Sequence, residues 1–416
     1  MPGPTKYDGL EPPTLVEDAR GLERLLADLG GQDEIAVDTE ADSFYRYRER
    51  VCLIQITVED RDYLIDPLRK LDLTGFGRVL ADPRKVKVFH DGEYDVLILK
   101  HDFGYRFENL FDTRVAAAAL GYASPGLAAV LAERFDVRLD KSLQRSNWSI
   151  RPLSPQQIDY ARLDTHFLLP LMHDLRGELE ERGRTMIVDG ECRRLEALEP
   201  PLRDFNADEF IRLKGARTLG PSQMQALREL YIMRDHMARE RDVPPFKVLG
   251  NAALVDAAGA LPTSQRQLDR VDGISPRLVR RLGNEILRAV SRAKKKGPLK
   301  KAPQLPSRDG TGELDEEQGE LHDRLKRWRK NTATRQGMDS SLVLNRRTLL
   351  LLAKKRPRSE SGLTAVNGLL DWQIREFGDD ILAVVHDFEE DLAAGRVELR
   401  RRRKTRSRSK DNQRSV

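Results

Sequence analysis

The sequence predicts a mixed α/β domain in its N-terminal half, followed by two all-helical domains. Two stretches without an apolar period divide the 416 residues: segment 199–217, which contains a Pro-Pro pair, and segment 297–313, which is rich in Pro, Gly, Lys and Asp. Strand-like runs lie before the first stretch, and the two blocks after it repeat one helical pattern. A chain of this length also fits about three domains of ordinary size.

The first block contains short apolar or β-branched runs and, later, longer helical periods. Charged and turn residues bound each short run, so we expect strands at Ile35–Asp38, Val51–Thr57, Tyr63–Asp66 and Val86–His90. Helical periodicity predicts helices over Leu15–Leu29, Glu93–Asp102, Thr113–Leu120, Gly126–Arg134 and Pro155–Leu175. Because strands come first and helices dominate later, the order favours a mixed sheet over strict β-α alternation around a parallel one.

The second block, 221–292, and the third, 316–392, share one internal plan. Each begins with a long helix, continues through a second helix and a proline, and ends in a closing helix. The motifs LDRVDGI at 268–274 and LTAVNGL at 363–369 occupy equivalent places in the two blocks. The repetition predicts an internal duplication of a helical domain of about 80 residues.

Composition argues against a membrane protein and against a structural zinc site. No apolar run approaches the ~18–20 residues of a membrane span. The first residues lack the charged and apolar regions of a signal peptide, so we expect a cytoplasmic location. Cys52 and Cys192 are too few for a disulfide framework, and neither has a Cys or His neighbour at zinc-ligand spacing.

Positive charge is concentrated in short segments. The net charge is only +5, yet Arg400–Lys410 contains eight cations and no acid, and Lys294–Lys301 forms a second basic run. Such blocks are usually solvated and disordered, and we accept that interpretation for their structure. Disorder does not prevent contact with phosphates, so the uneven charge favours a polyanionic partner.

In two segments of the first block, acidic residues lie at the end of a predicted strand or just after it. Asp38 and Glu40 lie two residues apart after an apolar run, and side chains two apart on a strand point to the same face, where they can share a cation. An acidic pair at a strand end is often only solvated, so this pair needs support from elsewhere. In KVFHDGEYD, at 87–95, a strand ends at His90 and Asp95 lies one turn into the following helix.

The neighbours of Asp95 have simpler interpretations. Asp91 and Glu93 resemble residues that the N-terminal dipole favours at a helix start. His90 fits a hydrogen-bonded supporting residue better than a metal ligand.

A third segment places a phenol beside a carboxylate. Ser154 is the expected N-cap of a helix with Pro155 in its first turn. Tyr160 and Asp164 lie four residues apart in this helix and therefore share one of its faces. Tyr160 alone would fit a core aromatic, but with Asp164 beside it a shared polar pocket is expected.

These groups suit one reaction in particular. Phosphodiester hydrolysis needs a nucleophilic water at neutral pH and compensation for charge on the leaving oxygen, and two divalent ions ~3.5–4 Å apart supply both. Mg²⁺ and Mn²⁺ prefer carboxylate and water oxygens. We therefore expect a site for two divalent ions in which Tyr160 orients the attacking water and the ligands are Asp38, Glu40, Asp95 and Asp164.

The motifs resemble those of a known nuclease superfamily. DTE at 38–40, HDGEYD at 90–95 and YARLD at 160–164 are similar to the three exonuclease motifs of the DEDD superfamily, in the expected order. The chain resembles the tyrosine subclass, because the histidine subclass carries His five residues before the last aspartate and this chain has Asp159 there. Segment 147–171 and Asp140-Lys141-Ser142 resemble ribonuclease D, and the two helical blocks resemble HRDC domains.

The resemblance implies a ribonuclease H-like α/β exonuclease domain, with a mixed sheet flanked by helices, followed by two all-α HRDC-type domains. It also implies 3′→5′ release of nucleoside 5′-monophosphates from RNA, such as tRNA precursors or other structured RNA with 3′ extensions. Carried over by position, the resemblance implies that the four carboxylates are metal ligands and that they and Tyr160 are the catalytic residues. Further candidates for substrate contact or support of the site are His90, Gln55 and Lys141.

The same patterns give a domain plan. We expect a flexible N-terminus at 1–12, the exonuclease domain at 13–205 and a first HRDC domain at 217–296. A linker at 297–313, an HRDC-like domain at 314–396 and a basic disordered tail at 397–416 complete it. The last helical block departs most from the HRDC pattern, so its role in RNA binding is the least supported expectation.

Other functions compete with this one. A helicase needs a loop that holds a nucleoside triphosphate, and the sequence contains no Gly-Lys dipeptide. An HD-type phosphohydrolase is suggested by His-Asp pairs such as His90-Asp91, His101-Asp102 and His173-Asp174, yet His90 follows a strand and fits an all-helical metal site poorly. Two alternatives stay open: an exonuclease acting on DNA, because contacts to a 2′-hydroxyl cannot be inferred from sequence, and a catalytically weak RNA-binding protein.

Overall fold

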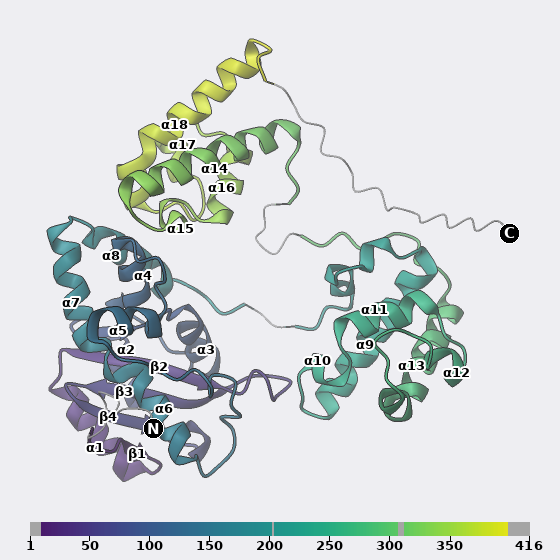
Figure 1. The fold of residues 1–416 in the computed structure, drawn as a ribbon, viewed down its shortest axis with the longest axis horizontal. Coiled ribbons are helices and arrows are strands. Elements are labelled where there is room, and N and C mark those ends of the chain that lie inside the picture. The colour runs from purple at the N-terminus through teal and green to yellow at the C-terminus, as the bar shows by residue number, and fades with distance from the viewer. Residues whose placement is uncertain (1–9, 202–203, 307–311, 398–416) are drawn as a thin grey trace. The chain divides into compact units, whose positions relative to one another are not determined.

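The structure, a computed structural model, describes residues 10–201, 204–306 and 312–397 (Figure 1). Of these residues, one compact unit holds 10–42, 50–201 and 312–397, and the other holds 43–49 and 204–306. The expectations for the first nine residues and for the basic tail from 398 onward lie outside the described residues. In the described part, no helix combines the length and the apolar character needed to cross a membrane.

A six-stranded mixed sheet forms the centre of the N-terminal domain. Its strands are β1 (Thr14–Val16), β2 (Glu34–Ala41), β3 (Val51–Val58), β4 (Arg61–Ile65), β5 (Val86–Phe89) and β6 (Leu110–Asp112), in the order β1-β4-β3-β2-β5-β6. β3 runs antiparallel to both β2 and β4, and the remaining neighbours pair in parallel. The predicted mixed sheet is confirmed.

Helices surround this sheet. They are α1 (Ala19–Gly30), α2 (Thr74–Leu80), α3 (Glu93–Phe103), α4 (Thr113–Leu120), α5 (Leu127–Phe135), α6 (Pro155–His166), α7 (Leu168–Glu181) and α8 (Thr185–Glu196), with the short 3₁₀ helix η1 at Pro67–Arg69. All eight residues of β3 are buried, because neighbouring strands lie on both sides and helices cover the faces. α6 packs across β2, β3 and β4 (Figure 1).

Two helical domains follow. The buried apolar residues of the first form a cluster of their own, whereas those of the second belong to one cluster with the N-terminal domain. The first contains η2 (Ala207–Arg212), η3 (Ala216–Thr218), α9 (Pro221–Glu240), α10 (Pro245–Val248), α11 (Asn251–Ala260), α12 (Gln265–Leu268) and α13 (Pro276–Lys296). The second contains α14 (Glu316–Gln336), α15 (Ser340–Val343), α16 (Arg346–Lys355), α17 (Glu360–Thr364) and α18 (Asp371–Ala393). The two repeated motifs match in conformation, since Gly273 and Gly368 both have positive φ, at 74° and 87°.

Two predicted helices differ from the structure. The expected helix Leu15–Leu29 begins only at Ala19, because Val16 pairs with Ile65 in the sheet and Asp18 caps the helix by accepting from the Gly21 nitrogen at 2.7 Å. The expected helix Pro155–Leu175 is interrupted at Phe167. Pro170 explains the break, because its ring would clash with the carbonyl of His166 in a continuous helix.

Two strands, β1 and β6, and two helices, α2 and α8, were not predicted from the sequence. β1 and β6 have three residues each, which is too short to display an alternating pattern. α2 has seven residues, two of them glycines, so its helical period is weak. The other predicted strands and helices of this domain agree with the structure to within three residues, apart from the two differences described above.

Candidate active site

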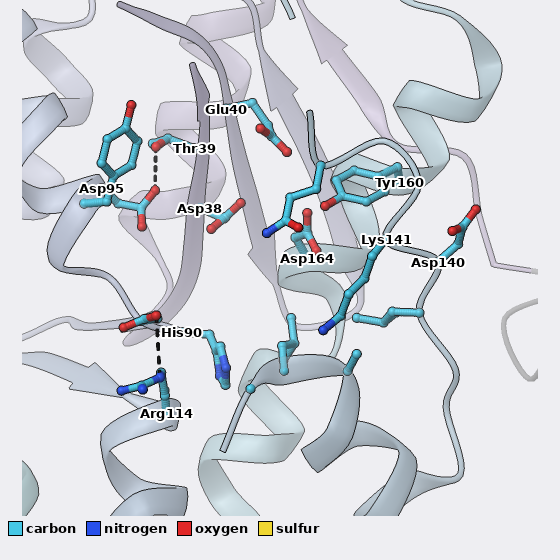
Figure 2. A pocket seen from close by; sticks show the side chains of 17 residues that line it. Asp38, Thr39, Glu40, His90, Asp95, Arg114, Asp140, Lys141, Tyr160 and Asp164 are labelled. Atoms are coloured by element: carbon cyan, nitrogen blue, oxygen red, sulfur yellow. Dashed lines mark hydrogen bonds and ion pairs between the residues drawn. The ribbon is translucent and has the colours of Figure 1, made fainter. Parts of the chain in front are cut away.

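One pocket of about 340 Å³ in the N-terminal domain gathers most of the residues that the sequence singled out. Figure 2 shows the four carboxylates and Tyr160 around this pocket, and they come from β2, α3 and α6. His90 and Lys141 also line it, whereas Gln55 does not. The structure thus brings together Asp38, Glu40, Asp95, Tyr160, Asp164, His90 and Lys141.

β2 places the first two carboxylates. Asp38 and Glu40 alternate with Thr39 along the strand, so both carboxylates point to the face that α6 covers. The register with β3 shifts between Glu40 and Ala41, which marks an irregularity directly after the acidic pair. Such irregularities redirect a strand and often border functional sites.

Hydrogen bonds to the Asp112 carboxylate hold the loop at Asp91 and Gly92, from which the helix that carries Asp95 begins. Asp91 has a left-handed backbone with φ of 62°, and the Asp112 carboxylate accepts hydrogen bonds from the Asp91 nitrogen at 3.1 Å and the Gly92 nitrogen at 2.8 Å. Asp91 was expected to support the helix start with its own charge, but the carboxylate that binds the backbone there belongs to Asp112. The Asp91 side chain instead lies 3.5 Å from Arg114.

Thr39 joins β2 to this helix. Its hydroxyl donates to Asp95 Oδ1 at 2.5 Å, in a buried position (Figure 2). Thr39 was not predicted as a site residue, because its place between two acidic residues on a strand predicts that it points away from them. The identity of its partner follows only from the packing of α3 beside β2.

The start of α6 is fixed by a capping box. Ser154 Oγ accepts from the Gln157 nitrogen at 3.2 Å, and Gln157 Oε1 accepts from the Ser154 nitrogen at 3.0 Å, as the sequence predicted for the N-cap. Tyr160 and Asp164 then face the pocket one turn apart. The Tyr160 ring packs against buried Trp148, with 5.8 Å between ring centroids, so the position of the phenol is also fixed.

The four carboxylates repel one another in a poorly solvated place. Burial, and then the neighbouring carboxylates, hold the pKa of Asp38 well above its ordinary value and raise the pKa of Glu40 to about 9. Burial raises the pKa of Asp164 to about 7 and that of Asp95 to about 6, the latter against the opposing hydrogen bond from Thr39. Buried oxygens whose negative charge is unfavourable in the absence of a counterion fit divalent cations.

Tyr160 stays protonated beside these groups. Burial and then the neighbouring carboxylates raise the pKa of its phenol, since a second negative charge would be unfavourable there. The phenol can therefore donate a hydrogen bond into the pocket at neutral pH.

The protonation of His90 follows from its partner. His90 Nδ1 lies 2.9 Å from Thr113 Oγ1, and the single proton of that hydroxyl is donated to the Phe89 carbonyl at 3.0 Å. Nδ1 must therefore be the donor to Thr113. Burial lowers the pKa of His90 to about 4, so the ring is neutral and its buried Nε2, which has no partner among the described residues, is an acceptor.

Two cationic residues border the pocket. Lys141 lies on the segment between α5 and α6 and makes no ion pair with any residue that the structure describes. Arg114 lies in the first turn of α4 beside Asp91. Arg114 was not predicted as a site residue, since its only signal in the sequence was its position two residues after Asp112.

The exonuclease and HRDC assignments are supported by comparison with protein families. Residues 13–180 match the model of the 3′-5′ exonuclease family, and residues 223–290 and 318–385 each match the HRDC domain model. The chain is 33% identical to the exosome complex component 10 homolog of Caenorhabditis elegans over 289 residues, which is 68% of this chain and 33% of that protein. It spans between 32% and 42% of the length of that protein and of six further relatives, which are named as exosome components, RRP6 or RRP6-like.

Solved structures agree with these matches. The catalytic core of RRP6 from Trypanosoma brucei superposes with a TM-score of 0.64 at 31% identity, covering 71% of this chain and 83% of that one. Escherichia coli RNase D, described as an exoribonuclease involved in structured RNA processing, gives a TM-score of 0.64 at 26% identity, covering 92% and 99%. With its exonuclease domain and its two HRDC domains, the chain therefore belongs to the ribonuclease D and RRP6 family of DEDD 3′–5′ exonucleases.

Proposed function

We propose that this protein is a metal-dependent 3′→5′ exoribonuclease that releases nucleoside 5′-monophosphates from RNA 3′ ends. The observation that carries the proposal is one pocket in which four carboxylates from three separate segments, one buried and three half-buried, meet a protonated phenol. Similarity to ribonuclease D and RRP6 supports RNA as the substrate class. By analogy with the RNA processing described for the Escherichia coli relative, the proposed role is maturation of tRNA 3′ ends or turnover of structured RNA.

The main residues of the pocket have proposed tasks. The proposed ligands of two divalent ions, Mg²⁺ or Mn²⁺, are Asp38, Glu40, Asp95 and Asp164. When bound, the two ions supply a nucleophilic water at neutral pH and offset the charge on the leaving oxygen. Thr39 holds the Asp95 carboxylate in place.

The remaining polar groups act on water and substrate. Tyr160 donates a hydrogen bond that orients the attacking water towards the scissile phosphorus. Lys141, which has no competing carboxylate partner in the described residues, attracts a backbone phosphate. His90 contributes a neutral acceptor held by Thr113.

We propose a cytoplasmic location, which fractionation of cells would test.

A direct assay tests this proposal. RNA and DNA oligonucleotides of identical sequence, labelled at either the 5′ or the 3′ end, would be incubated with Mg²⁺ or Mn²⁺. Release of labelled mononucleotide from the 3′ label, with a descending ladder from the 5′ label, is expected for RNA. Equal degradation of DNA would favour the alternative of a DNA exonuclease. Binding of RNA without cleavage would favour the alternative of a catalytically weak RNA-binding protein.

A further inference from the structure

Gln55 is a buried amide without a hydrogen-bond partner. Its side chain is fully buried in β3, and neither Nε2 nor Oε1 is hydrogen-bonded to any described residue. Burial of an amide without hydrogen bonds is costly, so nearly all buried polar side chains in folded proteins are paired. A buried amide that lacks a hydrogen-bond partner among the described residues, at the centre of a sheet, therefore requires an explanation.

The other buried glutamines of the described chain are satisfied. Gln157 bonds the Ser154 backbone and Ser146, and Gln225 donates to Glu229. Gln373, which is 1% exposed, donates to the Leu342 carbonyl at 2.7 Å and accepts from the Leu370 nitrogen at 3.0 Å. Gln55 thus differs from residues of the same type and the same burial.

The sheet register places Gln55 beside the carboxylate pocket. On β2 its direct partner is Asp38, and on β4 it is Leu64. Side chains opposite each other on neighbouring antiparallel strands lie on the same face, with Cβ atoms about 4.5–5.5 Å apart. Since Leu64 is apolar, Asp38 is the polar neighbour across the strands.

α6 covers this same face. Leu53 and Thr57, two residues on either side of Gln55, point the same way. Leu53 packs in a cluster with Ala161, and the Thr57 hydroxyl lies 2.8 Å from Thr165. Gln55 therefore lies beneath the turn of α6 between Ala161 and Thr165, which is the turn that carries Asp164.

We propose that Gln55 is a positioning residue of the cation site, whose amide nitrogen donates a hydrogen bond to the Asp38 carboxylate when a divalent cation is bound. The inference deepens the proposed function and rests on it. Its physical basis is general: ligand carboxylates are oriented by hydrogen bonds from a surrounding shell of polar residues. Full burial excludes contact between Gln55 and substrate, so the residue acts through Asp38 and not on RNA directly.

The proposal predicts an unusual combination of effects for Gln55→Leu. Without cation, the leucine replaces an unpaired amide by an apolar group of similar size, so the thermal midpoint of unfolding in EDTA should stay the same or rise. With Mn²⁺, the variant should bind about 10- to 100-fold more weakly in calorimetry of the full-length protein. A merely structural role would lower the unfolding midpoint and leave affinity for Mn²⁺ unchanged.

Gln373→Leu is the matched control, because it removes an amide that is bonded at both ends. It should lower the unfolding midpoint in EDTA and leave Mn²⁺ affinity unchanged. Gln55→Met repeats the test with an unbranched side chain, which separates loss of the amide from the shape of leucine.

The outcomes are distinguishable. Wild-type affinity for Mn²⁺ in both Gln55 variants, or a lowered midpoint in EDTA for both, would overturn the inference while leaving the proposed function intact. A wild-type protein that neither binds Mn²⁺ nor degrades RNA would overturn the proposed function and the inference together. Weaker Mn²⁺ binding with undiminished stability in EDTA would support both.

Discussion

Thr39 donates its hydroxyl to Asp95 over 2.5 Å and so joins the strand of Asp38 and Glu40 to the helix of Asp95. This hydrogen bond lowers the pKa of Asp95, against the effect of burial. It therefore favours the ionised form that a cation requires.

Thr39→Val keeps the shape of the side chain and removes the hydroxyl. The pKa of Asp95 should rise further, so turnover at pH 7 should fall by about tenfold and the pH optimum should move upward. Thr39→Ser, which retains the hydroxyl, should behave much like the wild type. A pH–rate profile of the three proteins checks this, and identical profiles for valine and threonine would remove Thr39 from the site.

Asp164→Asn should abolish nuclease activity without unfolding the protein. The substitution removes an ionised ligand, and losses on the order of 10³–10⁴ in turnover are expected for a residue of this kind. Asp159→Asn is the control, because Asp159 lies on the same helix with an exposed side chain near Arg162. Rates at saturating Mn²⁺, with circular dichroism of each variant, provide the test; near-normal turnover of Asp164→Asn would contradict the two-metal assignment.

Tyr160→Phe removes the hydroxyl and keeps the ring, so it tests the two roles of this side chain independently. The ring would still pack against Trp148, so the fold should be unchanged, while loss of the donor to water should lower turnover by about 10²-fold. KM should change little, because substrate binding does not depend on this hydroxyl. Tyr63→Phe, which removes a hydroxyl bonded to Asp28 away from the pocket, should retain normal turnover. If Tyr160→Phe matched that control, the phenol would be only a packing group.

The stability of the cation-free protein should fall as pH rises from about 5 to 9. The folded-state pKa values of Glu40 and Asp164 are raised, to about 9 and about 7, so the folded protein binds more protons than the unfolded chain in this range. Each extra proton lowers the free energy of unfolding by about 1.4 kcal/mol per pH unit. Urea unfolding in EDTA at several pH values measures this slope. Asp164→Asn should flatten the profile, and an increase of stability with pH would contradict the assignment.

Removal of residues 398–416 should weaken the binding of long RNA. The deleted segment contains eight cations between Arg400 and Lys410, and each cation that contacts a phosphate of single-stranded RNA contributes about 0.7 to the slope of log affinity against log salt. The slope should therefore fall by one to several units, while turnover of short oligonucleotides stays the same. Fluorescence anisotropy over a salt series tests this, and an unchanged slope would indicate that the tail does not contact RNA.

The sequence predicted those parts of the site that depend on local spacing. Asp38 and Glu40 share a face because strands have a period of two, and Tyr160 and Asp164 share a face because they lie one helical turn apart. The capping box at Ser154 is likewise a local pattern. These relationships hold in the structure because they involve neighbours along one element.

Contacts between distant segments were not predictable in the same way. Thr39 and Asp95 are 56 residues apart, and the Asp112 carboxylate binds backbone nitrogens 20 and 21 residues earlier. The first contact depends on how α3 packs beside the sheet and the second on how β6 pairs with β5, and β6 is too short to be recognised by its pattern. The burial of Gln55 also depends on α6 covering the sheet from a distant part of the chain.

The hydrogen bonds of Asp112 have a consequence for how this protein tolerates substitution. Asp112 ends a three-residue edge strand and does not line the pocket, yet its carboxylate holds the left-handed backbone from which α3 begins. Without that carboxylate the backbone at Asp91 and Gly92 would no longer be held, and the Asp95 side chain at the start of α3 would change its orientation. Sensitivity to mutation in this domain should therefore follow the hydrogen bonds that fix backbone geometry, and not simply the distance of a residue from the reacting phosphate.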